Sequence, residues 1–118
     1  MKKFLSFLMI VFTVSAIPAC KGPEMNTTAN TVLLDVRTTA EFEERNIPGS
    51  ILIPHDKIAN DINTKIPDKN TPIAVYCRSG RRSAIAATTL KQSGYTNITD
   101  LGSIENAARI LKKEIKEK

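Results

Sequence analysis

The sequence contains no tryptophan, only two cysteines, and only six phenylalanine and tyrosine residues in 118 positions. Two cysteines are too few to build the disulfide framework that stabilises many small secreted domains. Three of the six aromatic residues lie within the first 19 positions, and the others form no stripe with basic residues. Nucleic acid is therefore a poor candidate for a ligand.

The composition is otherwise ordinary for a globular protein, with 42% hydrophobic and 25% charged residues. Seventeen lysines and arginines exceed 12 aspartates and glutamates, which gives a formal net charge of +5. Removal of residues 1–19 would take Lys2 and Lys3 away and leave 99 residues with a net charge of +3. A chain of that length forms one small domain, and its excess positive charge suits a small anionic ligand.

Residues 1–19 have the pattern of an export signal. Lys2 and Lys3 precede an apolar run from Phe4 to Ile17, and Pro18-Ala19 follow before the first cysteine. This run is shorter than the roughly 20 apolar residues that a membrane-spanning helix requires. The pattern predicts a secretory signal that is removed from the mature protein.

Cys20 has two interpretations. The segment 17–20 resembles a bacterial lipobox, in which the cysteine is lipidated and becomes the first mature residue, although Pro18 departs from that pattern. Cleavage after Ala16 would instead leave Cys20 as a spare thiol. We expect a protein that is exported to the periplasm, or anchored on the outer side of the bacterial inner membrane or at the outer membrane. Residues 20–31 are polar and predict a short tether.

The remaining residues, 32–118, predict one α/β domain. Short apolar runs rich in valine and isoleucine alternate with helical patterns, which indicates a mainly parallel sheet with helices on both faces. The four predicted strands are Val32–Val36, Ile51–Ile53, Ile73–Cys77 and Ile98–Leu101. The expected architecture is a small three-layer domain.

Four helices are expected between and after these strands. Thr38 and Glu41 form a capping-box pattern at the start of the first helix, which runs to about Arg45. Asp56 is the predicted N-cap of a short second helix, in which Ile58 and Ile62 are four residues apart.

The third helix is predicted from about Arg82 to Gly94, with the small residues Ala84, Ala86 and Ala87 facing the sheet. Ser103 is the expected cap of the last helix. The predicted apolar stripe of that helix comprises Ile104, Ala107, Ala108, Leu111 and Ile115. Its other face is expected to be a solvated surface, with Lys112, Lys113, Lys116 and Glu117.

Cys77 occupies the most informative position of the sequence. It ends a central-looking strand, and the run Arg78-Ser79-Gly80-Arg81-Arg82 leads directly into a helix. Ligands of open parallel sheets bind beyond the carboxyl ends of the strands. The inward backbone N–H groups of such a loop and the helix N-terminus attract negative charge and favour a thiolate. We therefore predict that Cys77 is a nucleophile.

The loop residues have expected roles beside that nucleophile. Gly80 lets the loop turn without a Cβ in the pocket, and the arginines can donate charge-assisted hydrogen bonds to an oxyanion. The alternative is that Cys77 is simply a small apolar residue at the end of a core strand. Three arginines crowded together without an anion are costly, which favours the functional interpretation.

The segment 77–84, with Cys77 and Arg82 five positions apart, resembles the active-site loop of the rhodanese family. Three further segments resemble the family motifs "LDVR", "EF…HIPGAINIP" and "L…GY.NV..L", and these are Leu33–Arg37, Glu41–Pro54 and Leu90–Leu101. The match covers about residues 32–110. It is most similar to the single-domain, exported rhodaneses of the phage-shock type. Asn46 stands where the family often has histidine, and Leu101–Ile104 replaces "LGGI".

The resemblance implies a sulfurtransferase without metal or organic cofactor. Its Cys77 thiolate would take the outer sulfur of a donor such as thiosulfate, hold it as a persulfide and pass it to cyanide or a cellular thiol. Loop N–H groups from Arg78 to Arg82 would stabilise the persulfide. Arg78 and Arg81 would orient the sulfonate-like end of the donor, whereas Arg82 either braces the loop or touches substrate. The active form is expected to be a monomer.

Four further residues have structural interpretations. Asp35 and Arg37 are expected to form an ion pair that supports the loop, because buried charges need partners. His55, the only histidine, is not expected to be a catalytic base, since a loop-stabilised thiolate needs none. Tyr76 should point to the sheet face opposite Cys77 and pack in the core.

Two other functions remain open. A phosphatase or arsenate reductase with a related cysteine loop would need Cys and Arg six positions apart, one more than in this sequence. A sulfur carrier or docking module would retain Cys77 but would transfer sulfur to a dedicated partner without rapid turnover.

Overall fold

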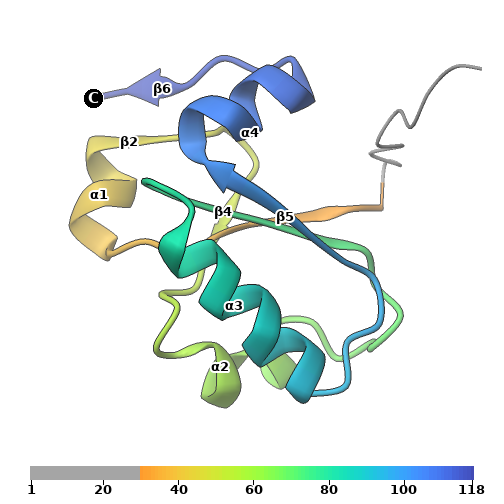
Figure 1. Ribbon diagram of the computed structural model, residues 1–118. Coiled ribbons are helices and arrows are strands. Elements are labelled where there is room, and N and C mark those ends of the chain that lie inside the picture. The colour runs from red at the N-terminus through yellow and green to blue at the C-terminus, as the bar shows by residue number, and fades with distance from the viewer. Residues whose placement is uncertain (1–29) are drawn as a thin grey trace, which may run out of the picture.

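The computed structural model describes residues 30–118. The predicted export signal, Cys20 and most of the predicted tether therefore lie outside the described residues. Four parallel strands form the central sheet in the order β3-β1-β4-β5. The strands are β1 (Val32–Asp35), β3 (Ile51–Leu52), β4 (Ile73–Cys77) and β5 (Ile98–Ser103). Because β4 is flanked by β1 and β5, Cys77 ends an internal strand of the sheet (Figure 1).

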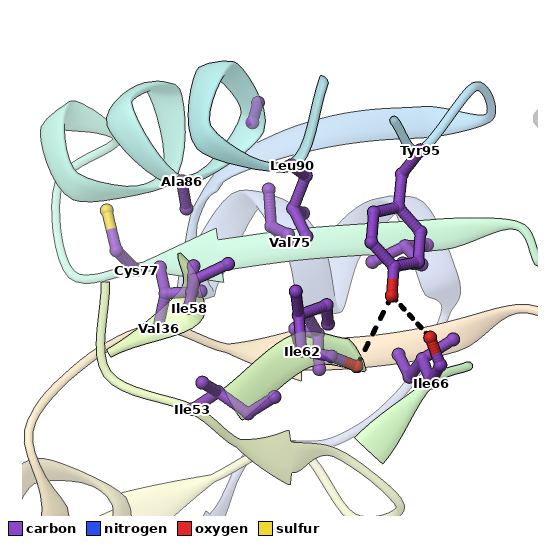
Figure 2. Packing of buried hydrophobic residues seen from close by; sticks show 13 residues of the cluster. Val36, Ile53, Ile58, Ile62, Ile66, Val75, Cys77, Ala86, Leu90 and Tyr95 are labelled. Carbon is purple, nitrogen blue, oxygen red and sulfur yellow. Dashed lines mark hydrogen bonds between the residues drawn. The ribbon is translucent and has the colours of Figure 1, made fainter. Parts of the chain in front are cut away.

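Helices cover the sheet on both faces, which confirms the predicted three-layer α/β architecture. The four helices are α1 (Thr39–Glu44), α2 (Ile58–Lys65), α3 (Arg81–Gln92) and α4 (Ile104–Leu111). On one face, α2 and α3 bury a cluster that includes Ile62 and Leu90 against the sheet. On the other face, α4 packs a second cluster with Tyr76 and Leu101. Figure 2 shows the first cluster, in which the Tyr95 hydroxyl also binds carbonyl groups at the end of α2.

The local sequence explains how α3 ends and how the last helix begins. Gly94 has a φ of +96°, and its N–H donates to the Lys91 carbonyl while the Tyr95 N–H donates to the Leu90 carbonyl. This pair of bonds forms a Schellman motif that satisfies the last carbonyls of α3. The predicted cap of α4 is confirmed, because the Ser103 side chain accepts a hydrogen bond from the Asn106 N–H.

The predicted cap of α2 is wrong. Asp56 lies within a turn that closes when the Lys57 N–H donates to the Pro54 carbonyl at 2.8 Å, and Lys57 directly precedes the helix without a side-chain cap. The prediction for the sheet-facing side of α3 was wrong at one residue. Ala84 is exposed, and the buried side of α3 is formed by Ser83, Ala86, Ala87 and Leu90.

The prediction for the last helix extended it too far. The backbone of Lys112 is left-handed, with φ at 53°, and the Lys113 N–H closes the helix end by donating to the Ala108 carbonyl. Ile115 therefore lies beyond α4, although it still packs against the core. Lys112, Lys113, Lys116 and Glu117 are exposed, as expected for a solvated surface, but none of them belongs to the helix.

A second, small sheet was not predicted. In it β2 (Arg45–Asn46) pairs antiparallel with β6 (Lys116–Glu117), so the C-terminal segment lies beside the chain that follows α1 (Figure 1). Strands of two residues have no periodic pattern, and this pairing joins distant segments of the chain. Within residues 30–118, no helix has both the length and the apolar character needed to cross a membrane.

Candidate active site

The loop after β4 brings a backbone donor directly onto the sulfur of Cys77. The Gly80 N–H donates to the Sγ atom at 2.9 Å, and α3 begins at the next residue. Gly80 has a φ of +96°, the left-handed region that favours glycine. A Cβ at this position would come no closer than 3.7 Å to the nearest backbone atom, that of Gly102. The backbone conformation of Gly80, and not a lack of space, therefore requires glycine.

The Cys77 side chain is fully buried and contacts both apolar core residues and hydrogen-bond donors of the loop. Figure 2 places it at the end of β4, with the sulfur pointing toward the side on which α3 begins and with Val36, Ile58 and Ala86 nearby. Burial alone raises the pKa of the thiol. Hydrogen bonds from Ser83 and from the backbone N–H groups of Gly80 and Ser79 stabilise the thiolate and bring the pKa of Cys77 below its ordinary value.

Ser83 is a site residue that the sequence reasoning missed. It is fully buried in the first turn of α3, and its hydroxyl donates to the Gly80 carbonyl at 2.9 Å. A hydroxyl rotates freely enough to direct the same proton to the Cys77 sulfur when that sulfur is charged. A small polar residue one helical turn beyond the loop glycine was the signal that could have identified it.

Arg82 lies in a two-point ion pair with Glu41. Its Nη1 and Nη2 atoms donate to the two carboxylate oxygens at 2.6 and 3.0 Å. The hydrogen bonds from Arg82 lower the pKa of Glu41 to about 2, against the opposing effect of burial. The same carboxylate completes the capping box with Thr38, so the predicted box is confirmed. Glu41 thus joins the start of α1 to the start of α3, a contact that the sequence did not predict.

Two other loop arginines, Arg78 and Arg81, are exposed and have no ion pair within the described part of the chain. Ser79 is exposed between Arg78 and Gly80. A pocket of about 290 Å³ lies beside this loop, and it is lined by Arg37, Glu41, Glu44, Arg45 and Arg78. The exposed cationic side chains are therefore free to contact an anion at the edge of the sheet.

Asp35, the last residue of β1, and Arg37 form a buried ion pair with three side-chain hydrogen bonds. The Arg37 Nη2 atom donates to Asp35 at 2.7 Å, and the Nε atom donates to both carboxylate oxygens at 3.0 and 3.1 Å. The same Nη2 atom also donates to the Arg45 carbonyl in β2. This pair therefore connects the end of β1 with the segment that borders the pocket.

Tyr76 points away from Cys77, as the alternation of a strand requires. Its hydroxyl accepts a hydrogen bond from the Ile47 N–H at 3.2 Å and lies 2.9 Å from the Ser50 hydroxyl. Burial raises the pKa of Tyr76 to about 12, so this side chain stays neutral. His55 is half-buried in the turn before α2, and its side chain makes no hydrogen bond within residues 30–118.

Potential metal ligands are not clustered in the described residues. No group of three or more histidine, cysteine, aspartate or glutamate side chains in residues 30–118 is arranged to hold a metal ion. The site is instead built from one thiol, backbone N–H groups and guanidinium groups. Such a set can stabilise a negatively charged sulfur and bind the oxygen atoms of an anion.

Comparison with known proteins is consistent with this site. The chain is similar to thiosulfate sulfurtransferase PspE of Escherichia coli (strain K12), with 35% identity over 75 residues, or 64% of this chain and 72% of PspE. It is also similar to the putative sulfur carrier protein YrkF of Bacillus subtilis (strain 168), with 39% identity over 72 residues. These residues are 58% of this chain and only 36% of YrkF.

Structural comparison gives the same result. A rhodanese with anions from E. coli matches with a TM-score of 0.67 and 30% identity, over 75% of this chain and 99% of that protein. The family model for the rhodanese-like domain matches residues 23–110 of this chain. This match confirms the resemblance seen in the four sequence motifs. The chain therefore belongs to the rhodanese-like domain family.

Proposed function

We propose that this protein is a thiosulfate sulfurtransferase that works through a persulfide on Cys77. The observation that carries the proposal is the hydrogen bond from the Gly80 N–H to the Cys77 sulfur, together with the lowered pKa of that thiol. A thiolate held in this way is available as a nucleophile near neutral pH. The similarity to a thiosulfate sulfurtransferase supports thiosulfate as the donor.

The first half-reaction transfers one sulfur atom. The Cys77 thiolate attacks the outer sulfur of thiosulfate, the S–S bond of the donor breaks, and sulfite leaves with the bonding electron pair. The loop N–H groups then stabilise the negative charge on the terminal sulfur of the persulfide. In the second half-reaction, cyanide or a thiol attacks that terminal sulfur, and the Cys77 thiolate is released.

The three loop arginines have different roles in this mechanism. Arg78 and Arg81 are exposed and without an ion pair among the described residues, so they are available to bind the sulfonate end of the donor. Arg82 is engaged by Glu41 and therefore braces the loop. Because Cys77 has no exposed surface, part of the structure around it must move before the donor reaches the sulfur.

Mass spectrometry of the intact protein after incubation with thiosulfate tests the first step. We expect one added sulfur atom on Cys77 and none in the Cys77→Ser variant. Cyanide should then remove the added sulfur and release thiocyanate. Absence of the added sulfur from the wild-type protein would contradict the proposal.

The similarity to a putative sulfur carrier favours a second candidate function. A carrier would form the same persulfide but would pass it to a dedicated protein partner. Repeated turnover with thiosulfate and cyanide, abolished by Cys77→Ser, would support the enzyme. One equivalent of persulfide with negligible turnover would support the carrier.

We further propose that the protein is exported, on the basis of the charged and apolar pattern in residues 1–19. Lipidation of Cys20 would then anchor it to a membrane, with residues 20–31 as a tether. Mass spectrometry of the mature N-terminus distinguishes a lipidated Cys20 from cleavage after Ala16.

A further inference from the structure

The end of β5 lies against the loop that carries the hydrogen-bond donor of the Cys77 sulfur. A Cβ placed on Gly80 would have the Cα atom of Gly102 as its nearest neighbour, at 3.7 Å, and the carbonyl carbon of Gly102 at 4.0 Å. Both are backbone atoms, which cannot rotate away as a side chain can. The backbone of Gly102 therefore borders the residue whose N–H reaches the sulfur.

The pairing of β5 with β4 is irregular at this point, where β5 leads directly into α4 (Figure 1). Val75 is opposite Asp100. Cys77 is opposite Ser103, so two steps along β4 correspond to three steps along β5. The extra residue is accommodated where Gly102 is left-handed, with φ at +75°. Such a bulge interrupts the ladder of hydrogen bonds between strands, so other contacts must hold this backbone in place.

Two side chains provide those contacts. The Asp100 carboxylate accepts a hydrogen bond from the Gly102 N–H at 2.9 Å. The Asn106 Nδ2 atom donates to the Leu101 carbonyl at 2.7 Å. The Asn106 amide is itself oriented, because its Oδ1 atom accepts a hydrogen bond from Arg109 at 2.6 Å and its nitrogen then faces the carbonyl. Asn106 thus connects the first turn of α4 to the backbone immediately before Gly102.

The loop needs this external contact because glycine adopts positive and negative φ about equally readily. The Ser83 hydroxyl and the Ala84 N–H both donate to the Gly80 carbonyl, at 2.9 and 3.2 Å. These two bonds fix the carbonyl side of Gly80. Contact with the Gly102 backbone restrains the same residue from the side of β5.

We propose that Asn106 and Asp100 are positioning residues for the nucleophile. They hold the Gly102 backbone against Gly80 and so keep the Gly80 N–H directed at the Cys77 sulfur. The inference rests on the proposed function, because that function depends on the thiolate that this N–H stabilises. Both residues act through the backbone at the end of β5 and not through a hydrogen bond to the sulfur.

Alkylation of Cys77 by iodoacetamide across a range of pH tests the proposal without any sulfur donor. In Asn106→Ala, we expect the midpoint of the pH profile to move upward. The rate at pH 7 should fall about two- to tenfold, because the loss cannot exceed what one intramolecular hydrogen bond contributes. At alkaline pH, where the thiol is fully ionised, the rate should equal that of the wild-type protein. A loss of stability alone would not produce this pH dependence.

Asn60→Ala is the matched control for this substitution. Asn60 is the third residue of α2, as Asn106 is the third residue of α4, and both helices have eight residues. Asn60 is exposed, and its side chain makes no hydrogen bond within residues 30–118. The same change of residue type at the same helix position should therefore leave the alkylation profile at the wild-type values.

Two substitutions of Asp100 provide an independent test. Asp100→Asn removes the charge but keeps an oxygen that accepts the hydrogen bond from the Gly102 N–H, whereas Asp100→Ala removes both. The midpoint of the alkylation profile should be higher in Asp100→Ala than in Asp100→Asn. Because both variants lack the charge, the difference between them measures the hydrogen bond. We expect it to be smaller than the effect of Asn106→Ala, since Asp100 is exposed and water competes for the bond.

An Asn106→Ala profile that coincides with the profile of Asn60→Ala would overturn the inference. If Asn106→Ala does not fold, equal midpoints in the two Asp100 variants would overturn it. These outcomes leave the proposed function intact, because alkylation requires no transfer of sulfur. Failure of the wild-type protein to take up sulfur from thiosulfate would instead refute the proposed function, and the alkylation profiles would still test the role of Asn106.

Discussion

Arg82 and Glu41 are 41 positions apart in the sequence, yet their side chains form a two-point ion pair beside the loop that follows β4. Arg82 lies in the first turn of α3, and Glu41 lies in the first turn of α1. Glu41 also accepts the hydrogen bond of the Thr38 backbone N–H in the capping box. A single carboxylate therefore fixes two helix starts relative to each other.

Neutralisation of Glu41 should lower stability in a pH-dependent way. Glu41→Gln preserves the capping box, in which glutamine substitutes for glutamate, but it removes the charge that Arg82 binds. We expect a loss of up to about 1 kcal/mol at pH 7, since both side chains are partly exposed. Denaturant unfolding of the wild-type protein and the variant measures the difference.

The sign of the pH dependence follows from the pKa of Glu41, which is about 2 in the folded protein against 4.5 ordinarily. The unfolded chain takes up the proton first, so the stabilisation is complete above about pH 4.5. It is lost as the pH falls from 4.5 toward 2. The difference in the free energy of unfolding between the wild-type protein and Glu41→Gln should therefore decrease over this range. A difference that stays constant would contradict the prediction.

The hydrogen bond from the Gly80 N–H should lower the pKa of the Cys77 thiol. Gly80→Ala strains the left-handed backbone by about 1–2 kcal/mol and moves the N–H away from the sulfur, which raises the pKa of Cys77. The pH profile of iodoacetamide reaction, followed on the Cys77 peptide by mass spectrometry, should shift upward. Sulfur transfer from thiosulfate should fall in parallel.

Gly94→Ala is a matched control for this substitution. Gly94 has the same φ of +96°, and its nearest contact for an added Cβ is a lysine side-chain carbon at 3.8 Å, similar to the space at Gly80. It lies at the other end of α3. Gly94→Ala should lose similar stability without a change in the alkylation profile. A shift as large as that of Gly80→Ala would mean that general destabilisation perturbs the thiol.

Ser83→Ala should also raise the pKa of Cys77, because a donor to the thiolate is lost. A hydrogen bond to a charged group contributes about 1.5–3 kcal/mol, so we expect the alkylation rate at pH 7 to fall about tenfold or more. Thr88→Ala provides the comparison, since its hydroxyl bonds only the exposed Ala84 carbonyl of the same helix. An unchanged alkylation rate in Ser83→Ala would contradict this prediction. The role of Ser83 would then be limited to its hydrogen bond to the Gly80 carbonyl.

The fold and the position of Cys77 at the end of an internal strand were predictable because their signals are local. Continuous apolar runs identify strands of a covered parallel sheet, and a cysteine at a strand end followed by glycine and arginines predicts an anion-binding loop. The contact of Glu41 with Arg82 was not predictable in this way, since nothing near either residue specifies a partner so far along the chain. The failure at Asp56 has a similar cause, because a turn from Pro54 to Lys57 competes with the cap.

The pairing of β2 with β6 was the least predictable feature. Each strand has two residues, and the pairing joins Arg45 with Glu117. No periodic pattern can form over such a length. The exposed lysines near the C-terminus were correctly expected to be solvated, but an amphipathic pattern that continued past Leu111 concealed the end of α4 at Lys112.

Asp35 and Arg37 should stabilise the fold as a pair and not individually. Asp35→Ala leaves a guanidinium that is only 2% exposed without its countercharge, which costs about 3–5 kcal/mol when a buried pair is broken. Arg37→Met likewise leaves the buried Asp35 carboxylate without its countercharge. The double variant removes both charges and should cost less than the sum of the two single changes, because neither partner remains buried and uncompensated. Chemical unfolding of the four proteins measures this coupling, and strictly additive losses would show that the two side chains contribute through separate contacts.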